Sequence, residues 1–313
     1  MGTPDFAVAS LNAIVNAGFD VAAVITVPDK PAGRGQKLSV SEVKEYAIAH
    51  NLNILQPEKL KDENFLAALK QLNADVFVVV AFRMLPEVVW SMPPEGTFNL
   101  HGSLLPQYRG AAPINRAVMN GEKETGVTTF FIEKEIDTGK IIFKEKTQIG
   151  ENESAGEVHD RLMIIGGELV VKTLHAIKNN NYKEIAQREF VKEGTLLNAA
   201  PKIFKDDCRI DWNKPVDEVH NHIRGLSPYP TAFTEFISPT GENYSVKLFR
   251  CEKEFKEHSQ AKGTITSNNR DYIYIAANGG FISVKELQLS GKKKLPVKDF
   301  LLGFKIEGNW IAK

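Results

Sequence analysis

The sequence predicts an α/β fold: a Rossmann-like, open and mostly parallel sheet in the first two-thirds, and a small C-terminal β-barrel of the oligonucleotide-binding (OB) type. Up to about residue 182, helical spacing of apolar residues alternates with short apolar runs, which is typical of an open sheet with helices on both faces. Beyond residue 205 the pattern changes to short strands separated by turn residues. We therefore expect a first domain at 1–182, a linker at 183–205 and a barrel domain at 206–313.

The first domain is expected to open with a helix. Thr3 is placed to cap it and Pro4 to occupy its first position, and apolar residues recur at helical spacing as far as Val15. The expected elements that follow are a strand at 21–27, a loop rich in Pro and Gly at 28–36, a helix at 42–50, a strand at 54–55, a helix at 64–72, a strand at 75–81 and a strand end at 96–100.

The first domain is expected to end in a hairpin and a long helix. Residues 127–132 and 141–146 are expected to pair around Asp137-Thr138-Gly139, since Asp and Gly favour turns. A helical pattern then covers 154–177, and Ser154 with Glu157 forms a capping box at its start. Residues 183–205 are polar and weakly periodic, as expected of a linker.

The predicted barrel consists of short strands with a helix on either side of them in sequence. The expected strands are 231–237, 245–249, 263–265, 272–276 and 281–287, and the expected helices are 216–223 and 297–302. His220 and His222 could form a metal pair on the first of these helices. Because no further His or Cys stands at ligand spacing, a solvated helix face is the better interpretation, and we expect no metal.

Composition narrows the class of protein. The formal net charge is zero, so binding of nucleic acid would need a local basic patch rather than the whole surface. Cys208 and Cys251 are the only cysteines, which excludes a disulfide framework. The longest apolar runs are too short to span a bilayer, and no signal peptide is visible. We expect a cytoplasmic protein that is monomeric and has no membrane partner.

The candidate site lies where a strand runs into a loop at residues 98–106, because ligands of open α/β sheets bind beyond the carboxyl ends of the strands. Asn99 and His101 are two positions apart, so both side chains leave one face of the strand, while Leu100 points into packing. By itself, an Asn-x-His at a strand end is more often a local hydrogen-bonding arrangement than a catalytic pair.

An amide and an imidazole in one crevice suit acyl transfer to an amine without a covalent intermediate. Donors placed around the tetrahedral oxyanion stabilise the transition state more than the substrate. Asp137 is the candidate for the group that handles the amine proton, directly, through water, or by holding His101 protonated, although Asp-Thr-Gly is also ordinary turn chemistry. The G-x-S-x-G elbow, the dinucleotide fingerprint and the P-loop are absent from the sequence.

Several segments together resemble the folate-dependent formyltransferases, and among them the methionyl-tRNA formyltransferase branch. They are residues 2–7, 28–35, 99–106 with 108–114, and 124–128 followed by 137–139. The Asn-x-His followed by Ser-Leu-Leu-Pro and a later Asp marks the wider family, which includes glycinamide ribonucleotide formyltransferase. The loop at 28–35 and the β-rich second domain favour the tRNA branch.

The resemblance implies catalytic roles for Asn99, His101 and Asp137. It implies 10-formyltetrahydrofolate as the formyl donor and methionyl initiator tRNA as the acceptor. The folate site would be lined by Ser103, Leu104, Leu105 and Pro106, and on a second wall by Phe82, Arg83 and Met84. The residues that it implies for tRNA binding are Lys30, Arg34 and Lys37, together with the barrel domain.

The resemblance leaves two points at which this chain differs from its relatives. A β-strand is expected before Gly2, in the centre of the sheet, and a sheet without it would carry unpaired backbone groups. Arg83 stands in a stretch that is often small or aliphatic. From residue 201 onward the chain carries 18 Lys and Arg against 14 Asp and Glu, a mild excess of the sign that phosphate binding requires.

Three other functions remain compatible with the sequence. The same chemistry could serve a small amine, although such an enzyme would need neither the basic loop nor the barrel. A non-catalytic tRNA-binding protein could retain this scaffold, which the intact Asn99, His101 and Asp137 argue against. Hydrolysis of formylfolate, with water in place of the amine, would use the same three residues.

Overall fold

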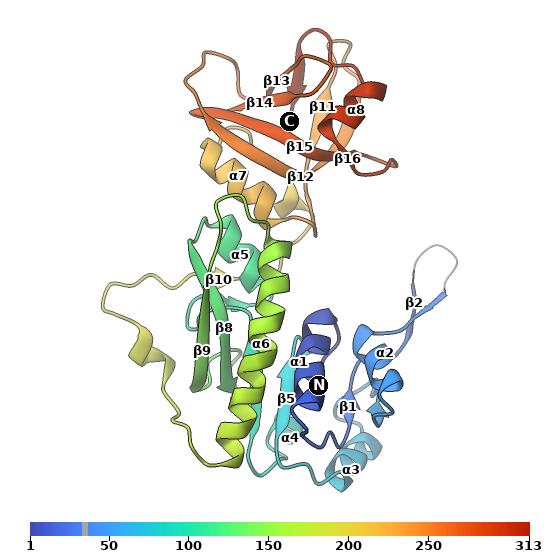
Figure 1. Ribbon diagram of the computed structural model, residues 1–313, viewed down its shortest axis with the longest axis vertical. Helices are drawn as coiled ribbons and strands as arrows, with labels where there is room; N and C mark the ends of the chain where they lie inside the picture. Colours follow the sequence, from blue (N-terminus) through green and yellow to red (C-terminus); the bar gives the residue numbers. More distant parts are fainter. Residues whose placement is uncertain (33–36) are drawn as a thin grey trace. The chain divides into compact units, whose positions relative to one another are not determined.

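The structure is a computed structural model and describes residues 1–32 and 37–313 (Figure 1). It divides into two compact units. Unit 1 comprises Met1–Gly110, Gly126–Thr147 and His159–Ala199, and unit 2 comprises Ala111–Thr125, Gln148–Val158 and Ala200–Lys313. Two internal segments thus join the C-terminal part of the chain in unit 2. The domain boundaries expected from sequence, at 182 and 206, stay a prediction.

Unit 1 is built on a mostly parallel sheet, as the sequence predicts. β5 (Phe77–Val80) and β6 (Thr97–His101) are parallel, and β8 (Glu124–Phe131) runs antiparallel to β6 with β9 (Ile141–Gln148) beyond it. A second parallel pair consists of β1 (Val24–Ile25) and β4 (Ile54–Leu55). The predicted strand at 21–27 is therefore reduced to two residues, and the predicted hairpin around Asp137 is confirmed.

Met1 and Gly2 lie between β1 and β5, where the resemblance implies a central strand. Gly2 forms a parallel bridge with Val80, and the Val80 N–H donates to the Met1 carbonyl at 2.9 Å. On the other side the Gly2 N–H donates to the Ile25 carbonyl at 3.0 Å. These two residues connect the backbone hydrogen bonding of β1 to that of β5.

Helices cover both faces of the unit 1 sheet. On one face α6 (Ala155–Lys178) packs on α1 (Asp5–Asn16), so closely that a Cβ on Gly167 would lie 3.2 Å from the Ala13 Cβ, and α2 (Glu42–Ala49) follows α1 (Figure 1). On the other face α3 (Glu63–Gln71) and α4 (Glu87–Trp90) share an apolar core with alternate residues of β5. The capping box of Ser154 and Glu157 is confirmed, since each side chain accepts the other's backbone N–H.

The shorter elements of the chain complete the description. They are β2 (Lys30–Ala32) and β3 (Lys37–Ser39), which pair antiparallel, then β7 (Arg109–Gly110), α5 (Pro113–Met119), the 3₁₀ helices η1 (Gln187–Phe190) and η2 (Asp206–Cys208), and β10 (Ala199–Ala200). The first helix begins at Asp5, and Thr3 does not cap it, because Pro4 takes the N-cap position without a side-chain hydrogen bond.

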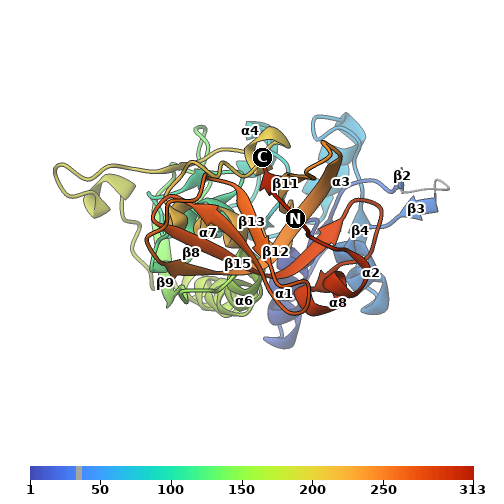
Figure 2. The same ribbon diagram turned by 90° about the horizontal axis from the view of Figure 1, so that it is seen from above.

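Unit 2 contains the predicted barrel. Its strands close a ring in the order β12, β11, β17, β13, β14, β15 and back to β12, with β16 added beside β15. Strands β11, β12, β13 and β15 of this ring are labelled in Figure 2. The bounds are β11 (Ala232–Ile237), β12 (Asn243–Phe255), β13 (Thr264–Ser267), β14 (Ile273–Ala277), β15 (Gly280–Leu289), β16 (Leu295–Pro296) and β17 (Trp310–Ala312). Sequence patterns missed β17, which is needed to close the ring.

The helix α7 (Val216–Gly225) contradicts one interpretation of the sequence. His220 was expected on a solvated face, but it is 0% exposed, and His222 is half-buried. The physical reason is that α7 packs against β12 and β15 as well as α5, so little of its surface faces solvent. The remaining helix is α8 (Val297–Gly303). Across the described residues, none of the helices combines the length and the apolar character that a membrane crossing requires.

Candidate active site

The strand β6 presents Asn99 and His101 on one face of the sheet. Asn99 lies opposite Val79 of β5 and Phe130 of β8, and His101 lies opposite Thr128. Leu100 leaves the other face and packs against α6, where a Cβ on Gly166 would be 2.8 Å from its Cδ2 atom. The two-residue periodicity therefore predicted the orientation of both polar side chains correctly.

His101 is buried, and groups from two separate loops face its ring. Its Nε2 atom lies 2.9 Å from the carbonyl oxygen of Tyr108. A carbonyl only accepts hydrogen bonds, so Nε2 carries the proton in this contact. The Nδ1 atom lies 3.9 Å from Oδ2 of Asp137. The nitrogen that is left to exchange a proton thus faces a carboxylate.

Asp137 is held in the turn between β8 and β9. Its Oδ2 atom accepts the Gly110 N–H at 3.0 Å, which fixes the carboxylate beside the imidazole. Its φ angle is +55°, in the left-handed region that Asp tolerates better than most residues. Gly139 follows because a Cβ at this position would come within 1.7 Å of the Phe131 carbonyl oxygen. The Asp-Thr-Gly turn therefore positions a carboxylate as well as reversing the chain.

The amide of Asn99 is half-buried, and we find no hydrogen-bond partner for it among the described residues. Its donors and acceptor are available to a ligand at this end of β6. An unpaired amide beside an imidazole and a carboxylate can donate a hydrogen bond to a carbonyl oxygen and stabilise the negative charge that develops on it.

Residues 103–106 form a tightly bonded loop after β6. Ser103 is fully buried and its hydroxyl donates to the Gln107 carbonyl at 2.6 Å. The Thr128 hydroxyl donates to the Ser103 carbonyl at 2.6 Å and accepts the Leu105 N–H at 3.1 Å. Leu105 belongs to an apolar cluster with Phe130 and Ile141. Of the predicted folate-lining side chains in this loop, Leu104 alone is not buried.

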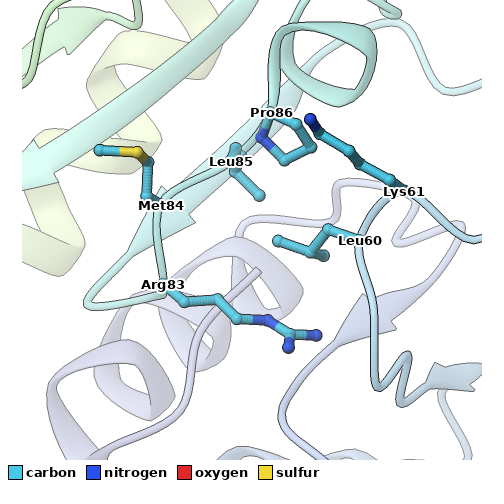
Figure 3. A pocket seen from close by; sticks show the side chains of 6 residues that line it. All are labelled: Leu60, Lys61, Arg83, Met84, Leu85 and Pro86. Carbon is cyan, nitrogen blue, oxygen red and sulfur yellow. The ribbon is translucent and has the colours of Figure 1, made fainter.

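A hollow of about 370 Å³ lies beside the second predicted wall. Figure 3 shows Leu60 directed toward Leu85, with the Arg83 side chain extended past it, and the Lys61 ammonium beside Pro86, while Met84 points away from them. The Arg83 guanidinium is held by backbone carbonyls, through Nη1 to Glu58 at 2.8 Å and through Nη2 to Pro57. Its Nε–H is buried and has no partner among the described residues.

Two family models match the chain over most of its length. Residues 1–174 match the model described as formyl transferase, and residues 202–305 match the formyl transferase C-terminal domain. The chain belongs to the formyl transferase family.

The relatives of this formyl transferase agree with the assignment. A methionyl-tRNA formyltransferase of Bacteroides thetaiotaomicron is 55% identical over 310 residues, which cover 99% of this chain and 96% of the relative. A methionyl-tRNA formyltransferase of Flavobacterium johnsoniae is 51% identical over 97% of this chain and 94% of its own length. Among solved structures, a sugar 3N-formyl transferase crystallised with dTDP and 5-N-formyl-THF aligns with a TM-score of 0.64 and 23% identity, covering 93% of this chain and 97% of its own.

Of the three basic residues expected to contact tRNA in this formyl transferase, Lys30 and Lys37 stand in sequence on either side of residues 33–36. Lys30 begins β2 and is exposed, and Lys37 begins β3, paired with Ala32. Arg34 lies outside the described residues. The base of the segment is anchored by Asp29, which accepts hydrogen bonds from Lys44 at 2.5 Å and from Gln56 at 2.8 Å. These two donors lower the pKa of the Asp29 carboxyl.

Sequence reasoning missed the groups that hold the catalytic candidates of the formyl transferase in place. Hydrogen bonds to His101, to Asp137 or to the loop that follows β6 come from four residues: Tyr108, Gly110, Thr128 and Gln187. Tyr108 and Gly110 are part of the motif that carried the resemblance, but nothing there indicates a role for their backbone. Gln187 stands in the polar segment interpreted as a linker, and no local pattern distinguishes it from its neighbours.

Proposed function

We propose that the protein transfers the formyl group of 10-formyltetrahydrofolate to the amino group of methionyl initiator tRNA. The observation that carries the proposal is the pairing of His101 Nδ1 with the Asp137 carboxylate, 3.9 Å apart, at the carboxyl end of a sheet strand that also presents Asn99. The 55% identity with a protein named methionyl-tRNA formyltransferase supports the choice of acceptor.

The proposed reaction is a direct attack by the amine on the formyl carbon. The new bond joins the amine nitrogen to that carbon, and a tetrahedral oxyanion forms on the formyl oxygen. The Asn99 amide donates to this oxygen, and removal of such a donor typically costs about 3 kcal/mol of transition-state stabilisation. The bond from the carbon to the folate nitrogen then breaks, so no covalent enzyme intermediate is required.

His101 and Asp137 handle the proton that the amine loses. The Tyr108 carbonyl occupies Nε2, so the proton is taken up at Nδ1, beside the Asp137 carboxylate that stabilises it there. The same proton passes to the folate nitrogen as the leaving group departs. Asp137 acts in this scheme by holding the protonated imidazole, one of the roles that the sequence left open.

The folate would occupy the space between the 103–106 loop and the hollow at Leu60, Arg83 and Leu85. Ser103, Leu105 and Pro106 are buried, so this loop would contribute backbone groups and shape rather than exposed side chains. Phe82, which lies 5.5 Å beneath the Arg83 guanidinium, and Met84, which is 69% exposed, would border the ring.

The acceptor would be bound through the segment of Lys30, Arg34 and Lys37, and through the barrel. Positive side chains near the phosphates of tRNA contribute affinity that falls with salt. Solved sugar N-formyl transferases share the fold at 22–23% identity, which says nothing of the acceptor used here. We place the enzyme in the cytoplasm, as a monomer without a membrane partner.

The test is transfer of labelled formyl from 10-formyltetrahydrofolate, with methionyl initiator tRNA and glycinamide ribonucleotide offered in parallel. The proposal expects label on the tRNA alone. Label on the small amine alone would keep the chemistry and overturn the acceptor. Label on neither, with folate still bound, would indicate hydrolysis of formylfolate or a non-catalytic tRNA-binding protein.

A further inference from the structure

Gln187 makes four hydrogen bonds through one buried side chain. It is 4% exposed and begins η1. Its Nε2 donates to the carbonyls of Asp137 at 2.8 Å and Gly139 at 2.9 Å. Its Oε1 accepts from Arg109, at 3.0 Å from Nε and 2.6 Å from Nη2. A carboxamide has two N–H donors and two oxygen lone pairs, and here all of them are used.

These bonds connect the two segments that hold the catalytic candidates. The segment 108–110 supplies the carbonyl that binds His101 Nε2 and the Gly110 N–H that binds the Asp137 carboxylate. The turn 137–139 carries the carboxylate itself. Gln187 hydrogen-bonds the Arg109 guanidinium of the first segment and the backbone carbonyls of the second. A shift of either segment would therefore disturb the hydrogen bonds that Gln187 makes to both segments.

Gln187 is itself anchored to the sheet. Ile185, two residues before it, exchanges both backbone hydrogen bonds with Ile141, the first residue of β9, at 2.9 and 3.0 Å. The carboxamide is therefore held from a strand end rather than from a free loop. Buried polar groups with every bond satisfied are rigid, because each alternative position leaves a group unpaired at a cost.

From this geometry we infer that Gln187 is a positioning residue for formyl transfer, which sets the spacing between the Asp137 carboxylate and the His101 imidazole. The inference rests on the proposed function of those two groups. Gln187 touches neither of the reacting molecules in this scheme. Glutamate at this position would keep the size and the bond to Arg109, but would turn an oxygen toward the Asp137 and Gly139 carbonyls.

The test compares Gln187→Met and Gln187→Glu with a matched control in the same segment. Glu184→Gln removes an exposed ion pair with Lys140, 2.7 Å across, and leaves the Asp137 turn untouched. The first readout is the ¹⁵N chemical shift of the His101 imidazole, assigned from its loss in His101→Asn. We expect both Gln187 variants to move it in the direction seen in Asp137→Asn, and the control to leave it unchanged.

The second readout is the split between kcat and KM. A displaced catalytic group costs up to about a hundredfold in rate, so we expect kcat to fall by roughly ten- to a hundredfold while KM for both substrates is nearly constant. In an Asp137→Asn background the same Gln187 change should have little further effect, because both act through one group. Glu184→Gln should retain wild-type kcat.

Two results would overturn the inference: His101 shifts at their wild-type values in both Gln187 variants, or a kcat loss that persists undiminished in the Asp137→Asn background. Failure of the proposed function gives a different pattern. Wild-type protein would then transfer no formyl group, while the His101 shifts of the Gln187 variants would still move and support the positioning role.

Discussion

His101 in unit 1 and His220 in unit 2 are both buried, yet the surroundings of their imidazole rings are opposite. Groups from two loops face the nitrogens of His101, a carbonyl at Nε2 and a carboxylate near Nδ1. Neither nitrogen of His220 makes a hydrogen bond within the described residues, although the Cys251 backbone is near enough to favour the charged ring weakly. The nitrogens of the first ring both face polar groups, whereas burial lowers the pKa of the second ring.

The environment of His220 explains its resistance to protonation. Burial, followed by the positive charges of Arg224 and Lys253, lowers its pKa to about 4, and Asp217 opposes this only in part. Arg224 donates to the carbonyl of Glu153, so its charge is held in place beside the ring. Burial is thus common to both histidines, and the groups that face their ring nitrogens distinguish them.

Removing the polar side chains at the end of β6 should have the largest effect. His101→Ala and Asn99→Ala should each lower kcat by about 10²- to 10³-fold, roughly 3–4 kcal/mol, because each removes a group that stabilises charge in the transition state. Circular dichroism of both variants should stay close to wild type, so that a loss of rate is not a loss of fold. Near-normal kcat in both variants would mean that the end of β6 is not the reaction centre.

Protonation of the His220 ring in acid should lower the free energy of unfolding of unit 2. A histidine in an unfolded chain titrates near pH 6.5, so between about pH 6.5 and 4 the folded unit binds fewer protons than the unfolded chain, and its free energy of unfolding falls with falling pH. The full effect is about 3 kcal/mol for such a pKa difference. His222, whose pKa burial also lowers, adds to it in the same direction.

The measurement is urea unfolding followed by tryptophan fluorescence from pH 7 to 4. In a Trp90→Phe background the remaining tryptophans are Trp212 and Trp310, both in unit 2. Other groups titrate in this range, so the quantity to compare is the difference between this protein and the same protein with His220→Leu. Equal pH dependence in both would show that His220 does not report on folding.

Thr128→Val should lower the stability of unit 1 beside His101. Thr128 lies opposite His101 across the β6–β8 pair, and its hydroxyl bonds both Ser103 and Leu105. Valine has the same shape but leaves a buried N–H and a carbonyl unpaired, which costs about 1–3 kcal/mol. Thermal unfolding of unit 1 should shift downward accordingly. A variant as stable as wild type would mean that water or a rearranged loop replaces these bonds.

His220→Leu at pH 7 should have the smallest effect. The ring has no hydrogen bond to lose, so an apolar side chain of similar volume should change the free energy of unfolding by less than about 1.5 kcal/mol in either direction. Urea unfolding of unit 2 measures it. A much larger loss would mean that a polar group stabilises the His220 ring in the folded protein.

The sequence predicted the parts of the site that depend on local periodicity. The alternation along β6 placed Asn99 and His101 on one face, and turn chemistry located Asp137 between β8 and β9. It also predicted the parallel sheet and the barrel. These features follow from residues within about ten positions of one another, where side-chain direction is set by the backbone period.

The contacts that position these groups could not be predicted in this way. Gln187 meets Arg109, 78 positions away, and the Asp137 turn, 50 positions away. His220 sits in a helical pattern that resembles a solvated face, and its burial depends on the packing of α7 against the barrel. β17 is a short terminal strand defined by its partners β11 and β13. Each depends on tertiary packing, which local patterns do not encode.

The proposed function requires His101 and Asp137 to act together in formyl transfer to methionyl initiator tRNA. The most direct measurement is single-turnover transfer of labelled formyl by wild type, His101→Ala, Asp137→Asn and the double variant. Groups that act as a unit are non-additive, so the double variant should be no slower than the slower single variant. Losses that multiply in the double variant, or wild-type rates in either single variant, would show that His101 and Asp137 do not act as a unit.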